Sequence, residues 1–126
     1  WNYNLDTHLP LPFTPPPSGK LEVLYELDSL KPFIKDLYFS AEVAKYLTQD
    51  RVDRNEPKTP GYTLIHLKAG STFNIRKQSF TLTAGVRNLF NKAYLNHISR
   101  YRILNLPEQG RNITFSLSIP FRTKLP

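Results

Sequence analysis

The chain has 126 residues and a formal net charge of +7 at pH 7, and it contains neither Cys nor Met. The absence of Cys excludes a disulfide framework, a thiolate nucleophile and Cys-bound zinc. The apolar runs fall far short of the roughly 18 residues that a membrane-spanning helix needs. A membrane role would therefore require strands in a closed barrel. Because the chain opens on Trp1 and lacks Met, we expect a processed protein or a piece of a longer one.

Basic side chains are scattered through the connections and the C-terminal tail, and they do not form one stripe. A nucleic-acid site would need Lys and Arg along one track that follows the phosphates. We therefore expect no nucleic-acid partner, whereas phosphorylated lipid is compatible with this distribution. The scattered residues are Arg51, Arg54, Lys58, Arg76, Lys77, Lys92, Arg100, Arg102, Arg122 and Lys124.

Apolar and polar side chains alternate with a period of two along much of the chain, which predicts an all-β fold built as an antiparallel meander. Residues 1–19 contain five prolines and are expected to form a connection, because proline removes backbone donors. Long and short connections alternate between the expected strands. Five strands are predicted at 20–27, 36–47, 62–75, 80–89 and 110–121.

Each predicted strand has one apolar and one polar face. Strands of roughly 9–11 residues with alternating long and short connections are typical of outer-membrane barrels. On the apolar side only Lys45 is charged, and it lies at a strand end. The residues expected to face lipid include Phe39, Ile65, Leu82, Ile113, Phe115 and Leu117. The residues expected to line a wet interior include Glu42, His66, Lys68, Arg87, Asn112 and Thr114.

Three stretches in the second half carry a family resemblance: PGYTLIHLKAGSTF at 60–73, VRNLFNKAY at 86–94 and GRNITFSLSIPF at 110–121. In this order they resemble the C-terminal end of TonB-dependent outer-membrane receptors. Such receptors often end the penultimate strand on Asn-Leu-Phe-Asn and open the last strand on Gly-Arg-Asn. The stretch LPFTPPPSGKLEVLYEL at 11–27 is similar to an upstream loop and strand of these barrels. The residues that carry the barrel-end signature are Asn88, Phe90, Gly110, Arg111 and Phe121.

The resemblance implies the C-terminal segment of a transmembrane barrel that has twenty-two strands in this family. It also implies uptake of a scarce ligand, such as a siderophore, haem, cobalamin or glycan, with no enzyme activity and no cofactor. The implied partners are outer-membrane lipid and lipopolysaccharide, the rest of the barrel with its plug, the barrel assembly machinery, and the TonB complex through an N-terminal region outside this sequence. Residues 122–126 depart from the family pattern, in which the final aromatic residue is usually terminal.

Recognition chemistry is concentrated in the second long connection, where His97, Arg100, Tyr101 and Arg102 occur together. Guanidinium groups bind anions through a fork of donors, and aromatic neighbours support them. We hypothesise that these residues face the cell exterior and contact lipopolysaccharide phosphates or an acidic ligand. A solvated loop without a ligand explains the same pattern equally well. No histidine has a second ligand at metal-like spacing, so no metal site is predicted.

One alternative from another class remains open on the sequence alone. A small soluble β-barrel or sandwich that binds an anionic ligand or nucleic acid would also show alternating strands. Five strands of a membrane barrel would expose an apolar face and two unpaired edges when isolated, and would aggregate in plain buffer. Solubility without detergent therefore distinguishes the two interpretations.

Overall fold

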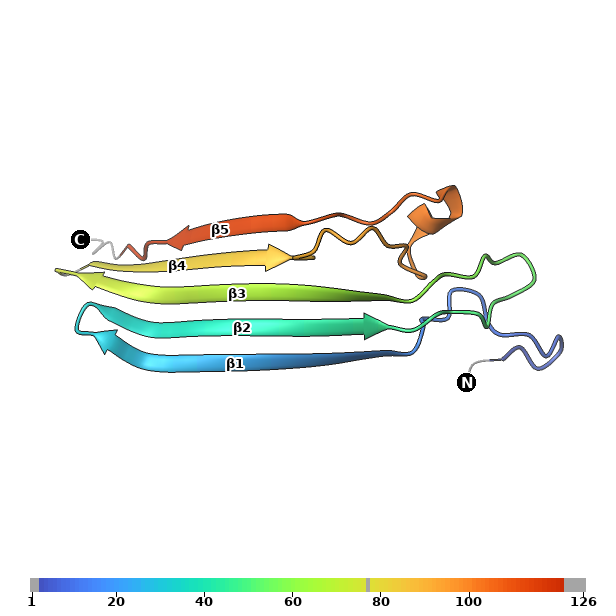
Figure 1. Ribbon diagram of the computed structural model, residues 1–126, viewed down its shortest axis with the longest axis horizontal. Helices are drawn as coiled ribbons and strands as arrows, with labels where there is room; N and C mark the ends of the chain where they lie inside the picture. Colours follow the sequence, from blue (N-terminus) through green and yellow to red (C-terminus); the bar gives the residue numbers. More distant parts are fainter. Residues whose placement is uncertain (1–2, 77, 122–126) are drawn as a thin grey trace, which may run out of the picture.

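The computed structural model describes residues 3–76 and 78–121. Each strand pairs antiparallel with its neighbours in sequence, in the order β1-β2-β3-β4-β5 (Figure 1). The five-stranded antiparallel meander predicted from the sequence is confirmed. The predicted turn residue Lys77 and the extension at 122–126 lie outside the described residues. The elements are β1 (Ser18–Lys31), β2 (Ile34–Tyr46), β3 (Tyr62–Ile75), β4 (Gln78–Arg87), the 3-10 helix η1 (Arg100–Leu104) and β5 (Asn112–Ser118).

The predicted strands at 20–27 and 36–47 were too short at the end where they meet. Lys31 pairs with Ile34, so a tight turn joins β1 and β2 and the ladder continues up to it. The pairing shifts register near this turn, and Asp36 adopts a φ of 50°. Asp tolerates this left-handed conformation better than most residues, which allows the strand to continue past the irregularity.

The predicted strand at 80–89 lies two residues too late in the chain, and the predicted strand at 110–121 was too long. β4 stops before Asn88, whose φ of 51° cannot continue a strand. β5 ends at Ser118, shortly before Pro120, which has no backbone N–H to donate to a ladder. Alternation alone did not reveal these ends, because the side-chain pattern runs on past the point where backbone pairing stops.

The register aligns side chains of one kind across all five strands. One row runs through Val23, Ala41, Leu67, Val86 and Ile113, and neighbouring rows on the same side are also apolar. Successive side chains on a strand point to opposite faces, so these rows form one continuous surface, the apolar face. The apolar face comprises Leu21, Val23, Tyr25, Phe39, Ala41, Val43, Ile65, Leu67, Ala69, Leu82, Ala84, Val86, Ile113, Phe115 and Leu117.

The opposite side of the sheet carries mostly charged and hydroxyl side chains, with Leu24, Ala44 and Leu64 as apolar exceptions. One row here runs through Leu24, Ser40, Lys68, Gly85 and Thr114. On β4 and β5 the side chains of this side are mostly small, which leaves its middle open. The polar face comprises Lys20, Glu22, Glu26, Tyr38, Ser40, Glu42, His66, Lys68, Thr83, Gly85, Arg87, Asn112, Thr114 and Ser116.

Apolar burial is confined to one end of the sheet. Among the described residues the buried apolar side chains are Ala44, Leu64 and Tyr62. The Tyr62 ring lies between those of Tyr46 and Tyr94, with centroid separations of 4.6 and 4.4 Å. Tyr94 belongs to the connection after β4, so this connection folds back over the sheet and builds the small core.

The apolar face, by contrast, has no covering layer in the described part of the chain. Ile113, Phe115 and Leu117 remain 58%, 77% and 61% exposed. The two outer strands, β1 and β5, each pair on one side only. Within the described residues no helix is long and apolar enough to cross a membrane.

Tyr38 fills the space that a side chain would occupy at its cross-strand partner Gly70. A Cβ atom at Gly70 would lie 2.5 Å from Cε1 of the Tyr38 ring and 2.8 Å from its Cζ. The ammonium group of Lys68 lies 5.6 Å from the centroid of the same ring, within cation–π range. The ring thus packs flat on the sheet because its partner has no side chain.

We predict that Gly70→Ala lowers the free energy of unfolding by about 1–3 kcal/mol, because the added methyl group must displace the Tyr38 ring. Gly19→Ala is the matched control, since a Cβ there meets nothing within 4 Å. Denaturant unfolding of both variants measures the difference. In a Tyr38→Ala background, where the ring is absent, Gly70→Ala should lower the free energy of unfolding far less, and equal effects of Gly70→Ala and Gly19→Ala would contradict this packing.

Candidate functional site

The connections at one end of the sheet fold together into a loop layer, defined here as residues 3–17, 47–61 and 88–111 (Figure 1). Backbone hydrogen bonds join the first two segments, where Leu47 N–H donates to the Pro17 carbonyl at 2.9 Å. The tight turns lie at the opposite end of the sheet. The residues predicted to take part in recognition, His97, Arg100, Tyr101 and Arg102, therefore lie at this end of the sheet.

Glu56 is the centre of the loop layer. One of its carboxylate oxygens accepts the backbone N–H of Phe13 at 2.8 Å and a guanidinium N–H of Arg102. The other accepts the backbone N–H of Asp53 at 3.3 Å. Arg102 also donates to the Pro57 carbonyl at 3.1 Å, and its guanidinium lies 5.0 Å from the centroid of the Phe13 ring. This buried ion pair ties all three segments of the loop layer together.

His97 completes the cluster and has no exposed surface. Its Nδ1 lies 2.9 Å from the Thr59 hydroxyl, and its Nε2 lies 3.4 Å from the Glu56 carboxylate, longer than a normal hydrogen bond. Burial lowers the pKa of His97 and the Arg102 charge lowers it further, which together outweigh the opposing effect of Glu56. His97 is therefore a neutral imidazole at physiological pH.

The pKa of Glu56 is also lowered. Burial by itself would raise it, but the hydrogen bonds from the Phe13 and Asp53 N–H groups and from Arg102, together with the Arg102 charge, outweigh this effect. Glu56 is therefore ionised at neutral pH and faces a charged guanidinium and an uncharged imidazole.

The hypothesis that His97 and Arg102 contact an external ligand is wrong for this structure, because both side chains are buried against Glu56 and Thr59. The sequence could not reveal this, since Glu56 lies more than forty residues away from either of them. Arg100 and Tyr101 are exposed on η1, and their role in binding stays a prediction.

The helix η1 was not predicted, although its caps are visible in the sequence. The Ser99 hydroxyl accepts the backbone N–H of Tyr101, and Asn105 adopts a left-handed φ of 54° at the other end. Ser and Asn are preferred at these two positions. η1 places Arg102 inward while Tyr101 points outward, with 61% of its surface exposed.

The barrel-end signature has a clear local function in the turn after β4. The buried Asn88 side chain accepts the backbone N–H of Lys92 at 2.8 Å and donates to the Lys92 carbonyl at 2.9 Å. The Asn91 side chain accepts the backbone N–H of Arg111 at 2.9 Å. A Cβ at Gly110 would lie 2.6 Å from Asn91 Oδ1, so only glycine fits there without displacement. The two motifs therefore hold each other in place.

The aromatic members of the signature play no part in these contacts. Phe90 and Phe121 are 74% and 82% exposed. Phe121 lies beyond the end of β5, so its side chain is not aligned by the sheet ladder.

The structure separates the other predicted site residues between the two faces. What each face contacts stays a prediction. The residues expected to line a wet interior all lie on the polar face: Glu42, His66, Lys68, Arg87, Asn112 and Thr114. The residues expected to face lipid all lie on the apolar face: Phe39, Ile65, Leu82, Ile113, Phe115 and Leu117.

A hollow of about 310 Å³ lies over the polar face, where Gly85 contributes no side chain. Glu42 is 3.8 Å from Lys20 and 4.0 Å from His66 Nε2. Both contacts are partly exposed, so each contributes little to stability. His66 Nδ1 accepts the backbone N–H of Asn88 at 3.0 Å, so a neutral His66 carries its proton on Nε2, the nitrogen nearer Glu42.

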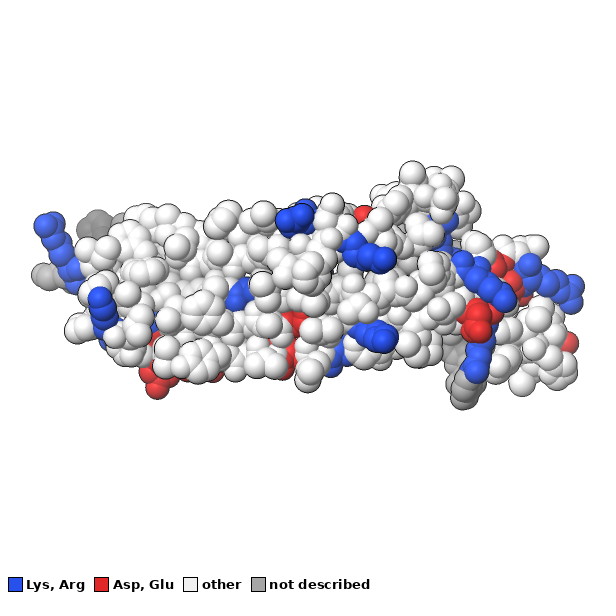
Figure 2. Space-filling model, in the orientation of Figure 1, with Lys and Arg blue, Asp and Glu red and all other residues white. Residues whose placement is uncertain are grey.

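The distribution of charged side chains on the visible side of the molecule does not indicate one kind of ligand. Figure 2 shows Lys and Arg dispersed over this side and mixed with Asp and Glu at the loop layer. Across residues 3–76 and 78–121, no three His, Asp or Glu side chains come together in a way that could hold a metal ion.

We predict that Arg102→Ala lowers the free energy of local opening of the loop layer by about 3–5 kcal/mol, because it leaves Glu56 buried without its partner. The two side chains are 1% and 7% exposed, so solvent does not replace the lost contact. Arg100→Ala removes the same group from an exposed neighbour and should change the opening free energy little. Amide hydrogen exchange at residues 50–60 and 96–106 measures the opening free energy of both variants. Similar losses for Arg102→Ala and Arg100→Ala would contradict a stabilising role of the buried pair.

The lowered pKa values predict that acid loosens the loop layer. Below the ordinary His pKa of 6.5 the unfolded loops take up a proton that folded His97 resists. Below the ordinary Glu pKa of 4.5 the unfolded loops protonate Glu56 before the folded state does. Stability is therefore full above about pH 6.5 and falls in two stages as pH decreases. Hydrogen exchange corrected for intrinsic rates should show both stages, and His97→Gln should remove only the first.

Comparison with known proteins gives no relative from which a role could be transferred. No family model matches the chain. No curated protein and no solved structure shows significant similarity to it. The functional conclusion therefore depends on the chain's own sequence and geometry.

Proposed function

We propose that this chain forms the C-terminal strands in the wall of a transmembrane β-barrel of the outer membrane, in a receptor that resembles the TonB-dependent kind. The observation that supports this most strongly is the uncovered apolar face, which extends across all five strands opposite a polar face. The role is active uptake of a scarce ligand, and we assign no catalysis to it.

The apolar face favours lipid over water. Burying a large apolar side chain contributes about 1.5–3 kcal/mol, and this face leaves many of them exposed. Leu21, Leu82 and Phe115 are 67%, 45% and 77% exposed. A soluble sandwich would cover such a face with a second sheet, and the described residues contain none. Acyl chains supply the missing contact without any further protein layer.

The open edges of β1 and β5 favour a larger closed structure. An exposed strand edge presents unpaired N–H and C=O groups, which are costly in lipid. Natural single-chain barrels have at least about eight strands, so the five described here need more strands to close. We propose that the rest of the barrel supplies them.

Strand length and connection length agree with this arrangement. β1, β2, β3 and β4 contain 14, 13, 14 and 10 residues, which at about 3.3 Å per residue is long enough to cross a bilayer at a tilt. β5 has 7 residues and is the shortest strand. The loop layer would lie outside the cell and the tight turns in the periplasm, as in other outer-membrane barrels.

The proposed partners follow from this placement and from the resemblance. Outer-membrane lipid would meet the apolar face, and lipopolysaccharide would meet the exposed Arg100 and Tyr101 of the loop layer. A plug inside the barrel, the barrel assembly machinery and the TonB complex are expected from the resemblance alone. The ligand itself is proposed only as a member of the siderophore, haem, cobalamin or glycan classes.

We predict that Phe115→Arg lowers the folding free energy in lipid vesicles by about 2–4 kcal/mol, because it places a charge on the lipid side near the middle of β5. Ser116→Arg is the matched control, since the neighbouring residue points to the polar face and its charge would meet water. Denaturant titration of the complete barrel in vesicles compares the two.

Two results would contradict the proposed function. The first is an equal penalty for the two arginine variants, since a membrane distinguishes the two faces and bulk water does not. The second is a compact, monodisperse monomer of this chain in plain aqueous buffer, because the uncovered apolar face should make it aggregate there.

A further inference from the structure

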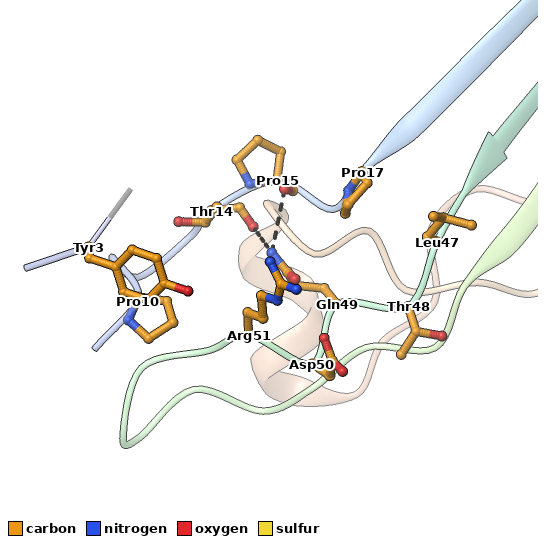
Figure 3. Close-up of a pocket in the computed structure, with 10 residues that line it drawn as sticks. All are labelled: Tyr3, Pro10, Thr14, Pro15, Pro17, Leu47, Thr48, Gln49, Asp50 and Arg51. Atoms are coloured by element: carbon orange, nitrogen blue, oxygen red, sulfur yellow. Dashed lines mark hydrogen bonds between the residues drawn. The ribbon is translucent and has the colours of Figure 1, made fainter. Parts of the chain in front are cut away.

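A cavity of about 370 Å³ lies where the proline-rich N-terminal segment meets the residues that follow β2 (Figure 3). One wall is formed by Tyr3 and Pro10, which are neighbours in an isolated β-bridge. Pro15, Pro17 and Leu47 contribute further apolar surface. The cavity has the size of a small-ligand pocket and is lined mainly by apolar groups.

The floor of this cavity is fixed by Gln49, which is only 4% exposed. Its amide nitrogen donates to the Thr14 carbonyl at 2.8 Å and to the Pro15 carbonyl at 3.4 Å (Figure 3). Its backbone exchanges two hydrogen bonds with Thr59, of 3.0 and 3.1 Å. The pocket is therefore held open by contacts that do not involve a ligand, which lowers the entropy cost of binding.

The polar groups at the cavity suit a ligand that carries hydroxyl groups better than a ligand that carries a net charge. The Thr14 hydroxyl donates to the Leu11 carbonyl at 2.6 Å, so it can accept from a ligand. The Thr48 hydroxyl accepts the Gly61 N–H at 3.3 Å, so it can donate to a ligand. Asp50 and Arg51 carry opposite charges, and the lining therefore has no net charge.

We propose that this cavity binds a neutral sugar ring. A pyranose has an apolar C–H face, which suits the Tyr3 ring and the prolines, and a hydroxyl rim, which suits Thr14, Thr48 and Asp50. An acid or an amine would gain little from a lining whose charges cancel. The site belongs to the loop layer and does not rest on the proposed transport function, because it needs neither the membrane nor the plug.

To test this, the complete protein is titrated with methyl glycosides of glucose, galactose and mannose, and ligand-observed NMR measures binding. At least one should bind with a Kd of about 1 mM, a typical affinity for a small contact area. Tyr3→Ala should weaken this binding about tenfold through the lost stacking surface. Phe90→Ala removes an exposed ring elsewhere in the loop layer and should leave the Kd unchanged.

A second variant and two charged probes complete the test. Thr48→Val keeps the shape of the side chain but removes its hydroxyl, so it should also weaken binding and decides the matter should Tyr3→Ala fail to fold. Glucuronate and glucosamine should bind no more tightly than the neutral glycosides. The proposal is overturned by the absence of binding by every neutral glycoside, by tighter binding of a charged sugar, or by a Kd that neither Tyr3→Ala nor Thr48→Val changes.

Discussion

The cross-strand register is the constraint on which the rest of the structure depends. Because side chains alternate with a period of two, a slip of one residue in any pairing would move that strand's apolar side chains to the polar face. The register shifts in the pairings of β1, β2 and β3 lie beside the β1–β2 turn, between Ser29 and Lys31 and between Lys35 and Tyr38. The middle of the sheet therefore stays in register, and each face keeps its prevailing character, with Leu24 and Ser71 among the exceptions.

The sequence predicted the sheet well and the loop layer poorly, for one physical reason. The alternation in a strand is local, so the range predicted for β3, 62–75, equals the observed one. In the loop layer the decisive partners are distant in sequence. Glu56 attracts Arg102 and His97 into the interior, and no local pattern marks that carboxylate as their partner. Residue type alone had suggested a ligand site there.

The strand ends show the same limit on a smaller scale. Asn88 ends β4 by adopting a left-handed conformation, and its side chain then replaces the lost ladder bonds with contacts to Lys92. Asn91 secures Arg111 before β5 begins. Asparagine is compatible with both a strand end and a turn, so only the backbone partners distinguish the two.

The buried anchors of the loop layer also explain what it leaves exposed. Arg102 donates its hydrogen bonds to Glu56 and to the Pro57 carbonyl, so it supports the loop layer. Any contact with a ligand would have to come from other, exposed residues. With Arg102 and His97 committed to Glu56, η1 presents Arg100 and Tyr101 on a fixed backbone, while Gln49 holds the neighbouring cavity open. Prearranged surfaces bind with a smaller loss of entropy than mobile loops. The internal ion pair therefore fixes the loop layer from within and leaves the exposed residues of η1 free of structural contacts to Glu56.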